Sequence, residues 1–282
     1  MRRGAADGSG RPGLISFVGA GPGAPDLITL RGAARLAAAD IVVWASSLVP
    51  EALLEHASPT ARRYDSATMT LEDVLAVYGD HPTAAIVRLH SGDPALYGAV
   101  QEQIDWCLAH DRAFEMVPGV SSLGAAAAAA GRELTVPRVA QSVVVTRLAN
   151  RTLPSMPESE SLGAFAATGC TLAVFLSAAR PDALGSQLLE PPSRYTPSTP
   201  AAIVVRASWP DEQVVPTTLG RLADDLRATG ATTTVLVLVG PALDGVAPRS
   251  HLYSPAFAHA HRRRSPPGTT TGRPARRSAG RG

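Results

Sequence analysis

The segment Arg88-Leu-His-Ser-Gly-Asp-Pro-Ala-Leu-Tyr97 joins an apolar strand pattern to a turn of small residues, and a helical pattern follows the turn. The segment Leu14-Ile-Ser-Phe-Val-Gly-Ala-Gly-Pro-Gly23 has the same design near the start of the chain. In open α/β folds, such turns bring backbone amides and small side chains to the carboxyl edge of a sheet, where ligands bind. The two segments therefore predict an α/β fold with a ligand site at the ends of these strands.

Strand and helix patterns alternate along the chain on both sides of these segments. In the first half we expect strands at Leu14–Val18, Ile41–Trp44, Ala85–Leu89 and Phe114–Val117, and helices at Leu30–Ala39, Pro50–His56, Thr70–Val77 and Ala95–His110. In the second half we expect helices at Ser122–Ala130 and Leu219–Ala228, and strands at Ser142–Thr146, Thr171–Leu176, Ala202–Arg206 and Thr234–Val239. Continuous apolar strands that alternate with helices are typical of a parallel sheet covered on both faces.

The length of 282 residues is sufficient for two domains, each with its own core. The turn Pro118-Gly119-Val120 suggests a boundary between an N-terminal domain at 13–118 and a C-terminal domain at 119–258. Residues 1–12 and 259–282 are rich in Gly, Ser, Thr, Pro and Arg without periodicity. We expect both tails to be disordered.

The composition is that of a globular protein, with 45% hydrophobic and 18% charged residues. The longest apolar runs, Leu123–Ala130 and Val235–Val239, are far shorter than the roughly 20 residues that cross a bilayer. After Met1-Arg2-Arg3 the segment Gly4–Gly13 is small and polar, where an export signal would be apolar. The sequence therefore predicts a cytoplasmic protein that does not enter the membrane.

All 26 residues counted as Lys or Arg are Arg, because the sequence contains no Lys. This excludes Schiff-base chemistry and the Walker-type phosphate lysine. The net charge of +2 hides an uneven distribution: the two tails carry ten Arg and one Asp, which leaves −7 on residues 13–258. The charge of the main body therefore does not favour binding to nucleic acid.

Metal and disulfide chemistry have no support in the sequence. Cys107 and Cys170 lie on different expected elements, without the spacing of a zinc site or a disulfide framework. His90 follows a buried strand pattern and is interpreted as a core histidine, and His259 and His261 lie in the tail. We expect no metal.

The Gly-rich turn at Gly19–Gly23 resembles the dinucleotide-binding fingerprint without satisfying it. Ala24 takes the place of the third Gly, Pro22 removes an amide donor, and no ribose-binding acid follows Ile41–Ala45. An ordinary NAD site is therefore disfavoured. The glycines would also be needed if the turn served close packing alone.

Two further turns carry polar groups at strand ends. Asp93 lies between Gly92 and Pro94, where it could cap a following helix, contact a ligand, or do both. The segment Arg206-Ala-Ser-Trp-Pro-Asp-Glu-Gln213 combines an anion-binding Arg with an apolar Trp and two acids.

Five segments, in order and spacing, resemble one family. They are Gly19-Ala-Gly-Pro-Gly23, His90-Ser-Gly-Asp-Pro94, Pro118-Gly-Val-Ser-Ser122, Val145-Thr-Arg147 and Arg206-Ala-Ser-Trp-Pro-Asp-Glu-Gln213. From about Leu14 to His261, the chain is similar to the tetrapyrrole methyltransferases, S-adenosylmethionine-dependent enzymes of corrin and sirohaem synthesis.

Further phrases are most similar to the branch of the family that methylates carbon 11 of precorrin-4 or its cobalt form. They are Ser46-Ser-Leu-Val-Pro50, Glu133-Leu-Thr-Val-Pro137 and Leu252-Tyr-Ser-Pro-Ala-Phe257, with the turns around Asp93 and Trp209. Two alternatives stay open. One is a sister enzyme that methylates another ring position of a precorrin or of uroporphyrinogen. The other is an RNA-directed methyltransferase of the same fold, for which the Arg-rich tail gives weak support.

The resemblance implies two α/β domains, each with a largely parallel or mixed sheet flanked by helices. It also implies a homodimer and an active site in the cleft between the domains. The S-adenosylmethionine site would be formed by Pro22, Ser91, Gly92, Asp93, Leu96, Ser121, Ser122, Leu176, Ala207 and Thr234. Because a tetrapyrrole acid carries several carboxylates, candidate substrate-binding residues are Arg88, Arg147, Arg151 and Arg206. No residue is assigned as the catalytic base.

Overall fold

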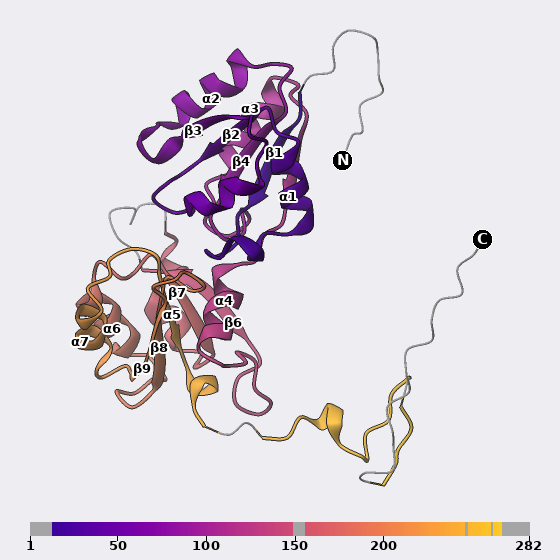
Figure 1. The fold of residues 1–282 in the computed structure, drawn as a ribbon. Coiled ribbons are helices and arrows are strands. Elements are labelled where there is room, and N and C mark those ends of the chain that lie inside the picture. The colour runs from indigo at the N-terminus through magenta and orange to yellow at the C-terminus, as the bar shows by residue number, and fades with distance from the viewer. Residues whose placement is uncertain (1–12, 149–155, 246–247, 261, 267–282) are drawn as a thin grey trace.

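The chain forms two sheets, one after the other along the sequence, each flanked by helices (Figure 1). The structure is a computed structural model that describes residues 13–148, 156–245, 248–260 and 262–266. The predicted disorder of 1–12, and of most of 259–282, concerns residues outside this set.

The first sheet has five parallel strands in the order β3-β2-β4-β1-β5. Its strands are β1 (Ile15–Gly19), β2 (Ile41–Trp44), β3 (Arg62–Asp65), β4 (Ile86–His90) and β5 (Phe114–Val117). Every residue of β1 and β2 is buried, as expected for a parallel sheet covered on both faces.

Helices lie on both faces of this sheet. On one face, α1 (Leu30–Ala37) and the 3-10 helix η2 (Glu51–His56) bury Leu36 and Leu53 against the strands. On the other face, α2 (Leu71–Asp80) and α3 (Gln101–Ala109) enclose a core that contains Tyr78 and Cys107. Thr70 caps α2, because its hydroxyl accepts from the amide of Asp73 and the Asp73 carboxylate accepts from the amide of Thr70.

The second sheet is mixed, in the order β6-β7-β10-β8-β9. Its strands are β6 (Val143–Arg147), β7 (Thr171–Phe175), β8 (Pro200–Val205), β9 (Gln213–Thr218) and β10 (Val235–Val239). Only β6 and β7 pair in parallel, and the other neighbours are antiparallel. Helices α5 (Leu162–Ala166), α6 (Pro181–Leu189) and α7 (Leu222–Ala228) cover one face, and α4 (Ser122–Ala129) packs on the other. The two-sheet α/β architecture predicted from the sequence is confirmed.

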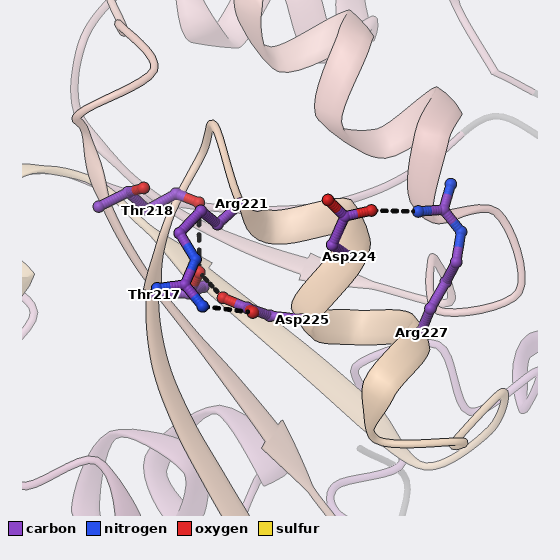
Figure 2. Close-up of polar contacts among 6 residues, drawn as sticks. All are labelled: Thr217, Thr218, Arg221, Asp224, Asp225 and Arg227. Carbon is purple, nitrogen blue, oxygen red and sulfur yellow. Dashed lines mark hydrogen bonds and ion pairs between the residues drawn. The ribbon is translucent and has the colours of Figure 1, made fainter.

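Polar contacts fasten α7 to the edge strand β9 (Figure 2). The carboxylate of Asp225 accepts from the hydroxyl of Thr217 and pairs with Arg221 at 3.0 Å. One turn away, Arg227 pairs with Asp224 at 2.7 Å in a more exposed position. The partly buried contact on Asp225 is thus the link between helix and strand.

The helix predicted at Ala95–His110 is wrong in its first half. Residues 94–100 form a turn in which Tyr97 and Ala99 have φ values of 57° and 47°, so α3 begins only at Gln101. A left-handed backbone cannot continue a right-handed helix. The domain limits at 13–118 and 119–258 stay a prediction. None of the helices in the described part of the chain has the length and composition of a membrane span.

Candidate functional site

A cavity of about 340 Å³ lies where the carboxyl end of the first sheet meets the second half of the chain. The loops after β1, β4 and β5 line one side, and the ends of β7, β8 and β10 line the other. The cavity brings together every residue predicted for the cofactor site: Pro22, Ser91, Gly92, Asp93, Leu96, Ser121, Ser122, Leu176, Ala207 and Thr234.

Glycines allow the three loops of the first sheet to touch. Gly21 and Gly92 exchange two backbone hydrogen bonds of 3.2 and 2.8 Å, and both have positive φ values. A Cβ on Gly119 would lie 2.1 Å from the carbonyl oxygen of Gly92. These glycines therefore serve close backbone approach, and the turn at Gly19–Gly23 is a wall of the cavity.

Asp93 joins two of these loops and caps no helix. One carboxylate oxygen accepts from the amide of Ala95 at 2.8 Å, and the other accepts from the amide of Gly119 at 2.9 Å. The prediction of a helix that begins near Pro94 is wrong, because this segment is a turn. Asp93 therefore fixes the shape of the cavity wall through backbone amides on the loops after β4 and β5.

The segment around Trp209 crosses from the second sheet to the first. The Trp209 indole Nε1 donates to the carbonyl of Pro22 at 2.9 Å, and the amide of Ala24 donates to the Ser208 hydroxyl at 3.0 Å. A Cβ on Gly23 would lie 2.2 Å from the indole ring. Gly23 is thus required for the approach of the two halves beside the cavity.

Left-handed backbone conformations occur around the cavity. Tyr97, Leu176 and Thr234 line it with φ values of 57°, 51° and 55°, and Arg206 adjoins it at 48°. Such conformations cost roughly 1–3 kcal/mol each for residues other than Gly and tend to gather at functional sites. The arrangement indicates a site whose shape is maintained against local strain.

Ser177 is a site residue that the sequence analysis missed. It is 1% exposed and lines the cavity, and its hydroxyl has no hydrogen-bond partner among the described residues. The signal in the sequence was weak: a serine among small residues after a strand, in Leu176-Ser-Ala-Ala179. An unpartnered buried hydroxyl is costly unless a ligand completes its hydrogen bonding.

Two of the candidate substrate-binding arginines line no part of the cavity. Arg88 lies on the α2/α3 side of the first sheet and donates to the hydroxyl of Ser66 at 2.7 Å, and burial lowers its pKa. Arg206 pairs with Asp211 at 2.6 Å and stacks over the Trp209 ring at 5.2 Å. Both side chains therefore support the surrounding structure.

The other two arginines have different outcomes. Arg147, at the end of β6, lines a second cavity beside the first. Arg151 lies outside the described residues.

His90 is buried at the end of β4, as expected for a core histidine. Its pKa is lowered to about 4, mainly because burial disfavours the imidazolium and also because Arg88 is positively charged, while a backbone hydrogen bond with Gly98 opposes the shift. Among the described residues, no group of three or more His, Cys, Asp or Glu is placed to hold a metal ion.

Comparison with known proteins decides the family. The family model of the tetrapyrrole (corrin/porphyrin) methylases matches residues 14–223. The chain belongs to this family. This tetrapyrrole methylase is 45% identical to the precorrin-4 C(11)-methyltransferase of a Sinorhizobium species over 253 residues, which cover 89% of the chain and 98% of that protein.

Solved structures agree with this assignment. The X-ray structure of a cobalamin biosynthetic enzyme, cobalt precorrin-4 methyltransferase, has a TM-score of 0.78 and 39% identity to the methylase. The match covers 82% of the methylase and 96% of that chain. The uroporphyrin-III C-methyltransferase of Thermus thermophilus, complexed with S-adenosylhomocysteine, has a TM-score of 0.66 and 28% identity, over 82% and 93% of the two chains. The methylase is therefore an S-adenosylmethionine-dependent methyltransferase.

Proposed function

We propose that this tetrapyrrole methylase transfers a methyl group from S-adenosylmethionine to carbon 11 of precorrin-4 or its cobalt form. The observation that carries the proposal is the gathering of the ten residues predicted for the cofactor site around one cavity, in a chain 45% identical to a precorrin-4 C(11)-methyltransferase. We further propose that it works in the cytoplasm as a homodimer.

The residues present fit the methyl donor. The donor has an adenine, a carboxylate and a cationic sulfonium, and a cavity of about 340 Å³ is within the range of small-molecule sites. Leu96, Leu176 and Ala207 would provide apolar walls, and the buried hydroxyl of Ser177 would gain the partner it lacks. When bound, the donor supplies a methyl group that needs no further activation.

The protein's own contribution is orientation and exclusion of water. The loops fixed by Asp93 and Trp209 define where a donor can lie, and the small residues at the strand ends leave room for a close approach of the acceptor. Holding two reactants at about 3–3.5 Å in line can supply roughly 7–11 kcal/mol of a barrier.

The test is an incubation of the protein with S-adenosylmethionine carrying a ¹³C-methyl group and with precorrin-4. We expect one labelled methyl in the product, located at carbon 11 by NMR. Label at another ring position, or turnover of an earlier intermediate only, would contradict the assignment and favour a sister enzyme.

A further inference from the structure

A second cavity of about 240 Å³ adjoins the first and has no role in the proposal above. It lies at the carboxyl end of β6, beside α5. Its lining consists of Tyr97, Val145, Thr146, Arg147, Met156, Glu160 and Phe165. Tyr97 lines both cavities.

Tyr97 forms the wall that the two cavities share, and its ring packs against Phe175. Their ring centroids lie 5.3 Å apart, and Phe175 lines the first cavity. Phe175 is also the register partner of Arg147 across β6 and β7. The left-handed backbone of Tyr97 thus places a ring from the first half of the chain against strand ends of the second.

The second cavity combines apolar surface with two opposite charges. Half-burial raises the pKa of Tyr97, the positive charge of Arg147 lowers it and the negative charge of Glu160 raises it, so both side chains act on the phenol. Val145 and Phe165 add apolar surface. This chemistry suits a flat apolar ring with a carboxylate substituent, which the guanidinium of Arg147 can bind.

We propose that the second cavity binds a carboxylate-bearing edge of the acceptor macrocycle. Arg147 pairs with the carboxylate, and Tyr97 orients the ring toward the methyl donor. The inference rests on the proposed function insofar as the acceptor is a tetrapyrrole acid. Methyl transfer needs donor and acceptor in adjoining spaces, and Tyr97 lines both cavities. A volume of about 240 Å³ accommodates part of a macrocycle, so the rest would extend outward.

Two variants with opposite expected signs test the charge argument. Arg147→Gln should raise the Kd of uroporphyrin III at least tenfold, measured by porphyrin fluorescence with saturating S-adenosylhomocysteine. Glu160→Gln should lower that Kd severalfold, because it removes the competing carboxylate. Arg194→Gln is the matched control, since Arg194 is exposed and lines neither cavity, and it should stay within twofold of the wild type.

The affinity for S-adenosylhomocysteine, measured by calorimetry, should stay within twofold in all three variants. In turnover with precorrin-4, Arg147→Gln should raise KM and leave kcat nearly unchanged. If Arg147→Gln kept the wild-type affinity for uroporphyrin III and the wild-type KM for precorrin-4, the inference would be overturned, even if carbon 11 is methylated as proposed. The inference would also fail if the wild type did not bind uroporphyrin III and the KM for precorrin-4 did not depend on Arg147.

A wild type that does not methylate precorrin-4 would instead refute the proposed function. In that case, weaker binding of uroporphyrin III by Arg147→Gln and tighter binding by Glu160→Gln would still support the second cavity as the binding site of a tetrapyrrole other than precorrin-4.

The wall is tested separately with Tyr97→Phe and Tyr97→Ala. Tyr97→Phe keeps the ring and should keep kcat within threefold. Tyr97→Ala removes the wall and should lower kcat at least tenfold, with a smaller change in the Kd of S-adenosylhomocysteine. Unchanged kcat in a folded Tyr97→Ala variant would overturn the orienting role of Tyr97.

Discussion

The Ser177 hydroxyl is buried in the wall of the main cavity, with no partner in the part of the chain that the structure describes, and this predicts opposite effects of its removal on ligand affinity and on stability. Ser177→Ala should weaken S-adenosylhomocysteine binding about fivefold, because one neutral hydrogen bond contributes roughly 1 kcal/mol. The same change should leave the Tm of the ligand-free protein equal or slightly higher, because it removes a buried group that is not hydrogen-bonded. Calorimetry and thermal unfolding measure the two effects.

Ser186→Ala is the matched control, since Ser186 is exposed on α6 and lines neither cavity. It should change neither the affinity nor the ligand-free Tm appreciably. Wild-type affinity in Ser177→Ala would show that the donor does not use this hydroxyl.

His90 gives a prediction about the pH dependence of stability. Its pKa in the folded protein is about 4, below the ordinary value of about 6.5, so the unfolded chain takes up a proton first as the pH falls. The free energy of unfolding should therefore fall by about 2 kcal/mol between pH 7 and pH 5 through this group alone. In His90→Gln, the free energy of unfolding should differ between pH 7 and pH 5 by about 2 kcal/mol less than in the wild type. Urea unfolding at the two pH values measures this difference.

His110 provides the comparison, because it is exposed at the end of α3. His110→Gln should keep most of the wild-type difference between the two pH values. If the free energy of unfolding of His90→Gln changed between pH 7 and pH 5 as much as that of the wild type, another group would be responsible for the pH dependence.

Single residues also show what the sequence could and could not predict about the site. The ten residues predicted for the cofactor site were identifiable through the family resemblance, because most of them lie in motifs that occur in a fixed order along the chain. The substrate-binding arginines could not be identified in this way, because a long charged side chain can turn toward either face of a sheet. Arg88 lies partly buried on the α2/α3 side, whereas Arg147 lines a cavity.

At the scale of the element, the contact between α7 and β9 can be tested through Asp225. Asp225→Ala should lower the free energy of unfolding by about 1–2 kcal/mol, because the Thr217 hydroxyl loses its acceptor and Arg221 its partner in a partly buried position. Asp224→Ala is the control. The Asp224 side chain is 86% exposed, and exposed ion pairs contribute about 0–1 kcal/mol.

Urea unfolding of both variants measures this difference. If the free energy of unfolding fell equally in the two variants, the exposed charges of α7, and not the hydrogen bond between Asp225 and Thr217 of β9, would determine the stability of this edge.

The strands that sequence patterns did not predict have a common physical feature. β3 and β9 are edge strands, and their residues are largely exposed or only half-buried. An edge strand needs no continuous apolar run, and it tolerates a proline such as Pro216. The central strands were predicted within one or two residues, because burial on both faces requires an apolar run. The turn before α3 was missed because its apolar residues line a cavity and not a helix face.

At the scale of the whole molecule, the cavity lies between the two sheets, which are held together next to it. Pro22 on one side and Ala207 on the other are linked through the Trp209 indole, which donates to the Pro22 carbonyl. The site should therefore depend on contacts between the two halves as much as on residues that touch the donor.

A double-mutant cycle on Gly23 and Trp209 tests this dependence. Gly23→Ala would put a Cβ at 2.2 Å from the indole ring, so the ring must move and the affinity for S-adenosylhomocysteine should fall at least tenfold. In a Trp209→Ala background the same Cβ meets no ring, so Gly23→Ala should cause little further loss of affinity for S-adenosylhomocysteine. The coupling energy should exceed about 1 kcal/mol, as is typical for residues in contact. Gly124→Ala, whose Cβ would meet nothing within 4 Å in α4, should leave the affinity unchanged. Additive effects of the two changes at Gly23 and Trp209 would mean that the donor site does not depend on this contact between the two halves.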